Sequence, residues 1–428
     1  MNLWTLSSNY ARHRPLSTAL NVLLLALGIA TISVLLLLSR QVKDTLTRNS
    51  RGIDLVVGAK GSPLQIILSS VFHADFPTGN ISLADVRPLQ RNRLIKNMIP
   101  LALGDSYRGF RIVGTNYDYP ELYEAALQTG RWWEKPLEVT LGAQVAQQLQ
   151  LASGEQFNSS HGLADDRINV HDEQAFRVVG VLKPTGSVLD NLILTAVESV
   201  WAVHEAHSDS VAHPQSVAQD SITRRGLPPA GLPQTRQSPA GQPQSEAGQD
   251  ITALLLEYRS PMAAVQLPRF INQRTNLQAA SPPFETARLF SLVGVGVDGL
   301  RAFAYVIIFM AALSTFIALY NALRERQYDL AVMRSLGASR GTLFLLMLLE
   351  GVIISLVGGI LGLLLGHGFL ILLAQWVPQP GQLGLTAFRL LPEEGWLLLG
   401  SVLVGIGAAL LPALAAYRTN VAQVLARK

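Results

Sequence analysis

The chain has 428 residues, of which 49% are hydrophobic and 15% are charged, and its mean hydropathy is +0.28. This composition is too apolar for an ordinary soluble protein and too polar for a chain embedded in a membrane throughout, so it predicts a few membrane spans beside a large aqueous domain. The net charge is +4, and the basic residues cluster at the ends of apolar segments, which excludes the basic stripe of a nucleic-acid-binding protein. Cysteine is absent, so an exported domain must fold without disulfides.

The first apolar segment covers residues 16–38 and contains no charged residue. At about 1.5 Å per residue it is long enough to cross a hydrocarbon core of about 30 Å. A cleavable signal peptide is the alternative, but the run is longer than a signal h-region and no small-x-small cleavage site follows it. We therefore interpret residues 1–15 as a cytoplasmic N-terminus and residues 16–38 as the first transmembrane helix.

The predicted aqueous domain covers residues 39–295 and opens with a helical stalk that continues the first span to about residue 49. Ser82 to Asp85 is typical of a capped helix start. Periodicity predicts strands at residues 99–103, 109–114, 139–141 and 176–182, a turn at Gly104–Asp105, and a short helix at residues 143–150. Strands and helices in this mixture predict an α+β domain. The basic residues after the first span do not oppose export, because long domains are translocated largely regardless of charge.

Two segments of this domain contain residues that are common in ligand sites, one of them for phosphate and the other for a metal ion. Residues 58–63 contain glycine and lysine, but a P-loop needs its lysine directly after the second glycine, and here Lys60 precedes Gly61. Residues 204–250 are rich in Gln, Ser, Pro, Gly and Ala, which predicts a disordered insertion. Its His204, His207 and His213 would need fixed geometry and further ligands to hold a metal. We therefore expect no catalytic residue, no metal site and no cofactor bound by this chain.

Three further apolar segments lie at residues 300–320, 342–377 and 395–416. The connector at residues 321–341 carries four Arg against two acidic residues, which places it in the cytoplasm by the positive-inside rule. The connector at residues 378–394 has one Arg and two Glu and is expected outside, whereas the tail at residues 417–428 is basic and expected inside. Four spans with both termini in the cytoplasm follow, and Gly358–Gly359 predicts a kinked or tilted third span.

The cytoplasmic connector has apolar residues at helical spacing, which predicts an amphipathic helix, and Gly337 is placed to end it. Together with the start of the third span, it resembles the permease signature shared by the MacB, FtsX and LolC/LolE group of ABC transporters. The matching residues are Arg326, Asp329, Leu330, Ala331, Arg334, Leu336, Gly337, Ala338, Ser339 and Glu350. Asp329 departs mildly, because Glu is usual there. Residues 140–149 and 176–182 resemble the periplasmic domain of the same permeases more loosely.

The resemblance implies a bacterial inner-membrane permease subunit that works with a second permease, identical or different, and with a separate cytoplasmic ATPase that binds ATP and Mg. It implies mechanotransmission, in which ATP hydrolysis moves the periplasmic domain to export or extract a hydrophobic, lipid-linked or peptide substrate. A periplasmic adaptor, lipoprotein or hydrolase would be a further partner, beside membrane lipids. Two alternatives stay open: a regulatory scaffold that controls a cell-wall hydrolase, and a membrane sensor without an ATPase.

The same resemblance implies that the connector docks on the ATPase. The docking candidates are Arg326, Asp329, Leu330, Met333, Arg334, Leu336 and Gly337. We expect Leu330, Met333 and Leu336 to be presented for burial in the partner, flanked by the two arginines. Glu350 lies about nine residues into the third span, where carboxylates are costly and often functional. We interpret it as an anchor that reaches water or Arg340, with a proton or substrate role as the alternative.

Gly358, Gly362 and Gly366 recur on one face of the third span. Small residues at this spacing let helices approach closely, so the face predicts an interface within the chain or between two protomers. His367 is expected near the outer boundary of the membrane, where it would be partly solvated.

Overall fold

The computed structural model describes residues 15–161, 170–203, 249–376, 386 and 388–418. The chain divides into two compact units. The second unit comprises residues 46–287, and the first unit comprises the parts of the chain before and after it. The insertion predicted at residues 204–250, with its three histidines, lies almost wholly outside the described residues, which resume at residue 249.

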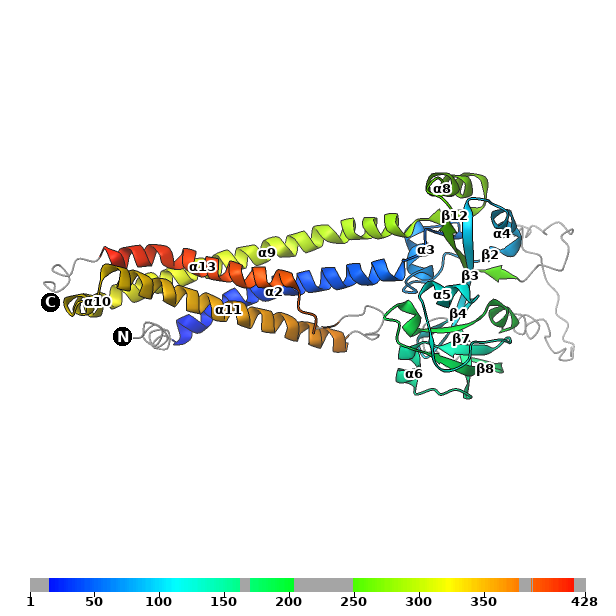
Figure 1. Cartoon of the computed structure of the whole chain (residues 1–428), viewed down its shortest axis with the longest axis horizontal. Coiled ribbons are helices and arrows are strands. Elements are labelled where there is room, and N and C mark those ends of the chain that lie inside the picture. The colour runs from blue at the N-terminus through cyan, green and yellow to red at the C-terminus, as the bar shows by residue number, and fades with distance from the viewer. Residues whose placement is uncertain (1–14, 162–169, 204–248, 377–385, 387, 419–428) are drawn as a thin grey trace, which may run out of the picture. The chain divides into compact units, whose positions relative to one another are not determined.

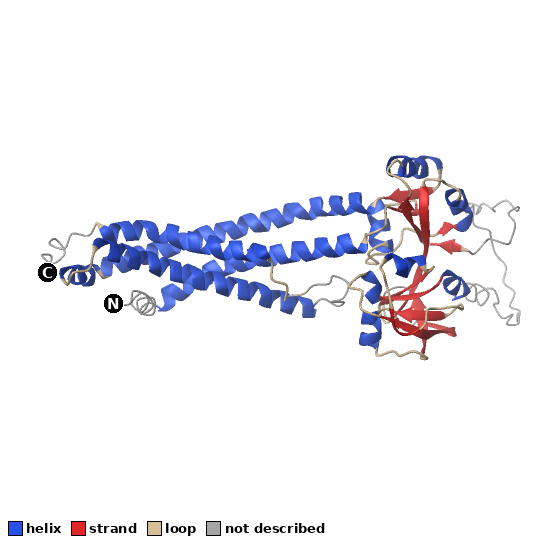
Figure 2. Cartoon of the chain, viewed as in Figure 1, coloured by secondary structure: helices blue, strands red, loops and turns tan. Residues whose placement is uncertain are grey.

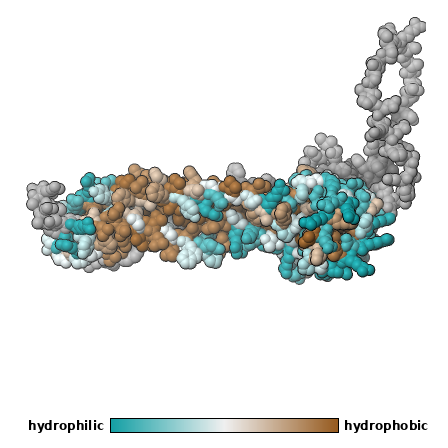
Figure 3. All heavy atoms as spheres, turned by 90° about the horizontal axis from the view of Figure 1, so that it is seen from above, coloured by the Kyte–Doolittle hydropathy of each residue, from teal (hydrophilic) through white to brown (hydrophobic). Residues whose placement is uncertain are grey.

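The first unit is a bundle of long helices that lie side by side (Figures 1 and 2). Among the described residues, four helices are long and apolar enough to cross a membrane: α2 (Pro15–Asn49), α9 (Pro282–Glu325), α11 (Arg340–Trp376) and α13 (Pro392–Tyr417). Hydrophobic side chains cover much of the surface of the bundle (Figure 3), as lipid contact requires. The four predicted transmembrane helices are therefore confirmed, and the helix that contains the second span, α9, begins at Pro282.

Glycines let α11 pack closely on two neighbours. A Cβ at Gly358, Gly362 or Gly366 would lie within about 3.2 Å of α2, and at Gly362 it would lie 2.7 Å from Cβ of Ile29. Gly359 faces α13, where a Cβ would lie 2.5 Å from the hydroxyl of Ser401. The glycine face therefore packs within the chain, and α11 passes through Gly358–Gly359 as one unbroken helix.

The second unit is a mixed sheet with short helices around it. In the described residues its strand order is β12-β1-β11-β3-β4-β9-β6-β8-β5, with β7 paired to β3 and β8. The pairs β4–β9 and β6–β8 are parallel, and the others are antiparallel. The strands are β1 (Leu55–Ala59), β3 (Ile95–Tyr107), β4 (Phe110–Thr115), β5 (Leu127–Gly130), β6 (Glu138–Leu141), β7 (Gln156–His161), β8 (Val170–Leu182), β9 (Leu192–Ala196), β11 (Ala253–Tyr258) and β12 (Leu277–Ala280). A separate pair joins β2 (Ile81–Ser82) to β10 (Asp250–Ile251).

Both faces of this sheet are covered. Successive side chains of a strand point to opposite faces, and in β1 the side chain of Val56 belongs to one apolar cluster while those of Leu55 and Val57 belong to another. The covering helices are α3 (Pro63–Ser70), α4 (Leu83–Gln90), α5 (Asp118–Leu122), α6 (Ala143–Leu149), α8 (Ala263–Arg274) and the 3₁₀ helix η1 (Val188–Asn191). Ser82 caps α4 as predicted, since its hydroxyl accepts a hydrogen bond from the backbone N–H of Ala84.

The turn predicted at Gly104–Asp105 is wrong. The strand β3 continues through these residues to Tyr107, and the register shifts between Leu103 and Ser106. The chain reverses at Arg108–Gly109, where φ is 46° and 82°. Two successive positive φ angles suit the right-handed twist of a hairpin, and glycine adopts such an angle at little cost.

Candidate functional site

The predicted amphipathic helix is α10 (Gln327–Ser335), which is shorter than the segment 321–341 expected from the sequence. Residues 321–325 belong to α9, and Arg326 interrupts the helix with φ −97° and ψ 12°. At the other end Gly337 has φ 102°, and the N–H groups of Gly337 and Ala338 donate to the carbonyls of Arg334 and Met333 at 3.1 and 3.0 Å. This is a Schellman ending, in which a glycine satisfies the last carbonyls and stops the helix.

The next helix starts directly after this glycine. The hydroxyl of Ser339 accepts a hydrogen bond from the backbone N–H of Thr342 at 3.2 Å, which caps the first turn of α11. The short helix α10 is thus bounded by Arg326 on one side and by Gly337 to Ser339 on the other.

The apolar residues of α10 divide between the interior and the surface. Leu330 is 1% exposed and packs in a cluster with residues of α9, α11 and α13, against which Met333 is partly buried. The buried members of this cluster are Leu323, Leu330, Leu343, Leu346, Met347, Ala413 and Ala416. Leu336 is 83% exposed. Of the three leucine and methionine side chains predicted to face the partner, the structure leaves Leu336 on the surface and uses Leu330 to hold α10 to its own bundle.

The charged residues divide in the same way. Arg326 and Glu350 lie 3.6 Å apart, and their side chains are only 13% and 6% exposed. The carboxylate of Glu350 therefore meets Arg326, not the predicted Arg340, and the pair joins the start of α10 to α11. Arg334 is half-buried on α10. The backbone of Asp329 lies in α10, and its side chain is outside the described residues.

A second polar cluster lies at the opposite end of the bundle and was missed from the sequence. Glu394 is buried near the start of α13, and its Oε1 accepts a hydrogen bond from the hydroxyl of Ser33 at 3.0 Å and lies 2.9 Å from Nε2 of His367. Its other oxygen accepts from the backbone N–H of Leu391 at 3.2 Å. His367 is 17% exposed, in keeping with the predicted partly solvated ring, but it is also held by a carboxylate, which the sequence did not predict. A Glu soon after Pro392 is a helix-start signal that could have drawn attention to Glu394.

The connector beyond this cluster is also tied to α2. The side chain of Gln41 exchanges two hydrogen bonds with the backbone of Thr386, at 2.8 and 2.7 Å, and Arg389 lies 2.8 Å from Asp44. Within the described residues no group of His, Cys, Asp and Glu is arranged to hold a metal ion.

Comparison with known proteins identifies both units. The model of the FtsX-like permease C-terminal domain matches residues 301–421, and that of the MacB-like periplasmic core domain matches residues 18–223. The two matches together support a permease of the MacB/FtsX type of ABC transporters. The permease is 23% identical over 409 residues to the macrolide export ATP-binding/permease protein MacB of Rhodopirellula baltica, and this match covers 88% of the chain. It spans only 56% of the length of that relative.

Two solved structures are similar to part of the permease. The periplasmic region of MacB from Actinobacillus actinomycetemcomitans shares 10% identity with a TM-score of 0.33, and the match covers 57% of this chain and 97% of that one. The extracellular domain of the noncanonic ABC-type transporter YknZ from Gram-positive bacteria shares 12% identity with a TM-score of 0.27, and covers 54% and 99% of the two chains.

The glycine-lysine segment of the permease has a structural role. Ser62 accepts a hydrogen bond from the N–H of Gln65 and caps α3, while Nζ of Lys60 donates to the carbonyl of Asn272 at 2.9 Å. A phosphate-binding lysine must keep its ammonium group for the ligand, so this geometry does not form a P-loop. The two matched domains are a permease domain and a periplasmic core domain, and neither is an ATPase domain.

Proposed function

We propose that this permease couples ATP hydrolysis by a separate cytoplasmic ATPase to movement of its periplasmic domain, and so exports or extracts a hydrophobic, lipid-linked or peptide substrate. It acts as a dimer of permeases, and ATP and Mg bind to the ATPase partners. The periplasmic domain meets an adaptor, a lipoprotein or a hydrolase.

The observation that carries this proposal is the division of α10 into a buried part and an exposed end. A partner that binds Leu336 at the Gly337 end has a large apolar side chain available, since this leucine is 83% exposed. The same helix is fixed to the bundle by Leu330 and by the pair Arg326–Glu350. A push on the exposed end therefore acts on α9, α11 and α13 together.

The path from α10 towards the periplasmic unit is a single helix. The 44 residues of α9 run without interruption from Pro282 to Glu325, a length of about 66 Å at about 1.5 Å per residue. Strand β12 ends at Ala280, two residues before this helix begins. A helix that follows strand β12 at one end, continues without interruption and is joined to α10 at the other supports the transmission of movement without passage of a substrate through the bundle.

The docking test compares two leucines of the same segment. Burying a leucine contributes about 1.5–3 kcal/mol, so loss of Leu336 should weaken ATPase binding about tenfold or more. Leu336→Asp should abolish co-purification of an ATPase from host membranes while the variant inserts and folds normally. Leu330→Asp should instead lower the yield of folded permease, because that side chain is buried. Arg340→Ala, at an exposed position beside the hinge, should have a milder effect on ATPase recovery.

Two results would overturn this function. Retention of the ATPase by Leu336→Asp would place the dock elsewhere on the permease. Recovery of no ATPase with the unmodified permease would favour the membrane sensor, and recovery of an ATPase together with a cell-wall hydrolase would favour the regulatory scaffold.

We also propose that both termini and α10 are cytoplasmic and that the sheet domain is periplasmic. The support is the excess of arginine in the segment around α10. The chain lacks cysteine, so single cysteines can be introduced at the exposed positions Ser153, in the sheet domain, and Ser335, at the end of α10. An impermeant thiol reagent added to intact spheroplasts should label Ser153→Cys and not Ser335→Cys. Equal labelling of both would refute this orientation.

A further inference from the structure

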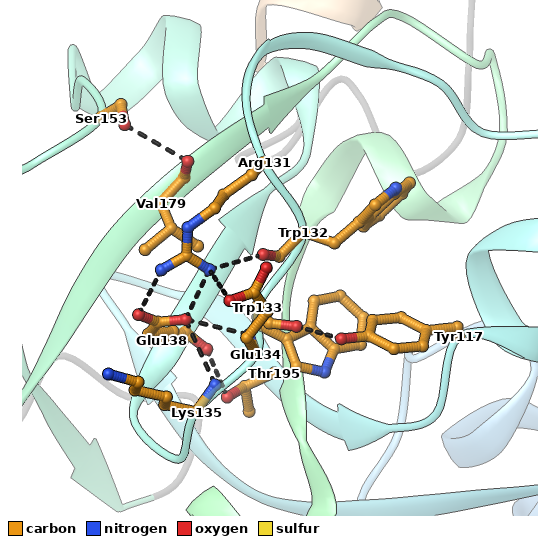
Figure 4. Close-up of polar contacts among 10 residues, drawn as sticks. All are labelled: Tyr117, Arg131, Trp132, Trp133, Glu134, Lys135, Glu138, Ser153, Val179 and Thr195. Carbon is orange, nitrogen blue, oxygen red and sulfur yellow. Dashed lines mark hydrogen bonds and ion pairs between the residues drawn. The ribbon is translucent and has the colours of Figure 1, made fainter.

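The segment between β5 and β6 is held rigidly by one carboxylate. The guanidinium of Arg131 donates to both oxygens of Glu138, at 2.8 and 2.6 Å, and the backbone N–H groups of Glu134 and Lys135 donate to Oε2 of Glu138 at 2.9 and 3.2 Å (Figure 4). Arg131 also donates to the carbonyl of Trp132 at 2.9 Å. The hydrogen bond from Arg131, followed by those from the backbone, lowers the pKa of Glu138 to about 2. The loop is thus tied to Glu138 by the side chain of Arg131 and by two backbone N–H groups.

This loop presents an aromatic platform. Trp133 is 3% exposed and belongs to the core of the sheet domain. Its ring centroid lies 5.2 Å from that of Tyr117 and 5.8 Å from that of Trp132, and the hydroxyl of Tyr117 donates to the carbonyl of Trp133 (Figure 4). Tyr117 is 50% exposed and Trp132 is partly exposed. Two aromatic rings are therefore held towards solvent by a buried third ring.

The platform lines a groove that carries negative charge. The groove has a volume of about 790 Å³, and its lining includes both rings, Leu127, and the carboxylates of Glu121, Glu124 and Glu134. Glu134 lies 3.7 Å from Arg131, which is the basic residue of the lining and is already bound to Glu138. Within the described ranges Glu121 and Glu124 make no ion pair. The groove thus offers apolar surface beside two carboxylates that lack a cation.

The groove also lies at an exposed edge of the sheet. Strand β5 is the last strand in the order, it pairs with β8, and its residues 128–130 are exposed. Its residues Leu127 and Gly130 line the groove. An edge strand presents backbone N–H and C=O groups that an extended chain can pair with, and the side chains beside the edge then select the sequence that binds.

We propose that this groove binds a basic, extended segment of another polypeptide, which places apolar side chains against Tyr117 and Trp132 and a Lys or Arg beside Glu121 and Glu124. Cations are attracted to the faces of Trp and Tyr, and the two free carboxylates add charge complementarity. A polypeptide, as opposed to a small organic cation, makes use of the backbone edge of β5. The proposal concerns the sheet domain alone and does not depend on the ATPase.

The test uses the purified full-length permease in detergent and a fluorescein-labelled octapeptide that alternates Arg and Leu. The peptide should bind with a fluorescence anisotropy change, and an alternating Glu–Leu peptide of the same length should not. Glu121→Gln with Glu124→Gln should weaken binding at least tenfold, as should Trp132→Ala, whereas Trp132→Phe should keep most of it. The control variant, Asp85→Asn with Glu198→Gln, removes the same charge from exposed positions outside the groove lining and should bind normally.

Three outcomes would overturn the proposal. The peptide fails to bind the unmodified permease, or the control variant weakens binding as much as the groove variant, which would indicate unspecific charge attraction. In the third outcome tetraphenylphosphonium binds and depends on Glu121 and Glu124 while the peptide does not, and the groove is then a site for small organic cations.

Discussion

The buried pair Arg326–Glu350 gives the sharpest test of how α10 is attached to the bundle. The two side chains are 3.6 Å apart and are 13% and 6% exposed, so neither charge has much access to water. Removing one partner of a buried pair costs about 3–5 kcal/mol, because the other charge stays buried without compensation. An exposed pair is worth only about 0–1 kcal/mol. Glu350→Gln should therefore lower the stability of the permease far more than a substitution that breaks an exposed pair.

The assay is thermal unfolding of the purified permease in detergent, followed by size-exclusion chromatography. With about 2 °C or more per kcal/mol for a unit of this size, Glu350→Gln and Arg326→Gln should each lower the melting temperature by at least about 6 °C. The double variant Arg326→Met with Glu350→Met should melt closer to the unmodified permease, because no charge is left buried. The control is Asp44→Asn, which breaks the more exposed pair with Arg389 and should change the melting temperature little.

Two results would refute this reasoning. Glu350→Gln melts like the unmodified permease, in which case the pair does not stabilise the bundle. Alternatively, the double variant loses as much as both single variants together, in which case each residue acts through separate contacts and not through the pair.

Three further predictions concern the glycine face of α11 and two buried polar groups of the sheet domain. Gly362→Val should lower the yield of folded permease because its Cβ would clash with Ile29, whereas Gly368→Val should be tolerated since nothing lies within 4 Å. Burial, followed by the charge of Arg111, lowers the pKa of His73 to about 3, so its contribution to stability is complete above pH 6.5 and is lost as the pH falls towards 3. His73→Asn, which tolerates the φ of 50°, should flatten the dependence of the melting temperature on pH in this window. The pKa of Glu138 is lowered to about 2 from the usual 4.5, so its contribution to stability is complete above pH 4.5 and is lost as the pH falls towards 2. The melting temperature of Glu138→Gln should therefore lie below that of the unmodified permease by an amount that shrinks between pH 4.5 and 2. A difference that stays constant over this range would contradict the prediction.

Features that depend on local chemistry were predictable from the sequence alone. An apolar run of about 20 residues is long enough to span a bilayer, and a helix satisfies its backbone hydrogen bonds there, so all four candidate spans were predictable. The end of α10 at Gly337 was predictable for a similar reason, since a residue that tolerates positive φ is required at one position. The rejection of a P-loop at Lys60 followed from spacing alone.

The boundaries of long helices and turns required the tertiary structure. Ser281, Pro282 and Glu285 form a helix-start pattern, but only the structure shows that this helix continues without a break into the span near residue 300. The hairpin formed by β3 and β4 contains two glycines at which the chain could reverse, Gly104 and Gly109. Pairing of Asp105 and Ser106 with β7 decided between them, because a turn at Gly104 would have removed these two residues from strand β3.

The site itself was decided by contacts between residues that are distant in the sequence. Leu330 and Leu336 are both leucines in a helical pattern, yet the side chains of α11 and α13 cover the first and leave the second exposed. The connector before the third span contains four arginines, and the sequence does not say which of them meets Glu350. The packing of the start of α10 against α11 selected Arg326. Glu394 meets Ser33 across 361 positions of sequence. Patterns of hydrophobicity fix which segments are buried, but they contain no information on which partner a buried charge will find, because that depends on how the helices pack.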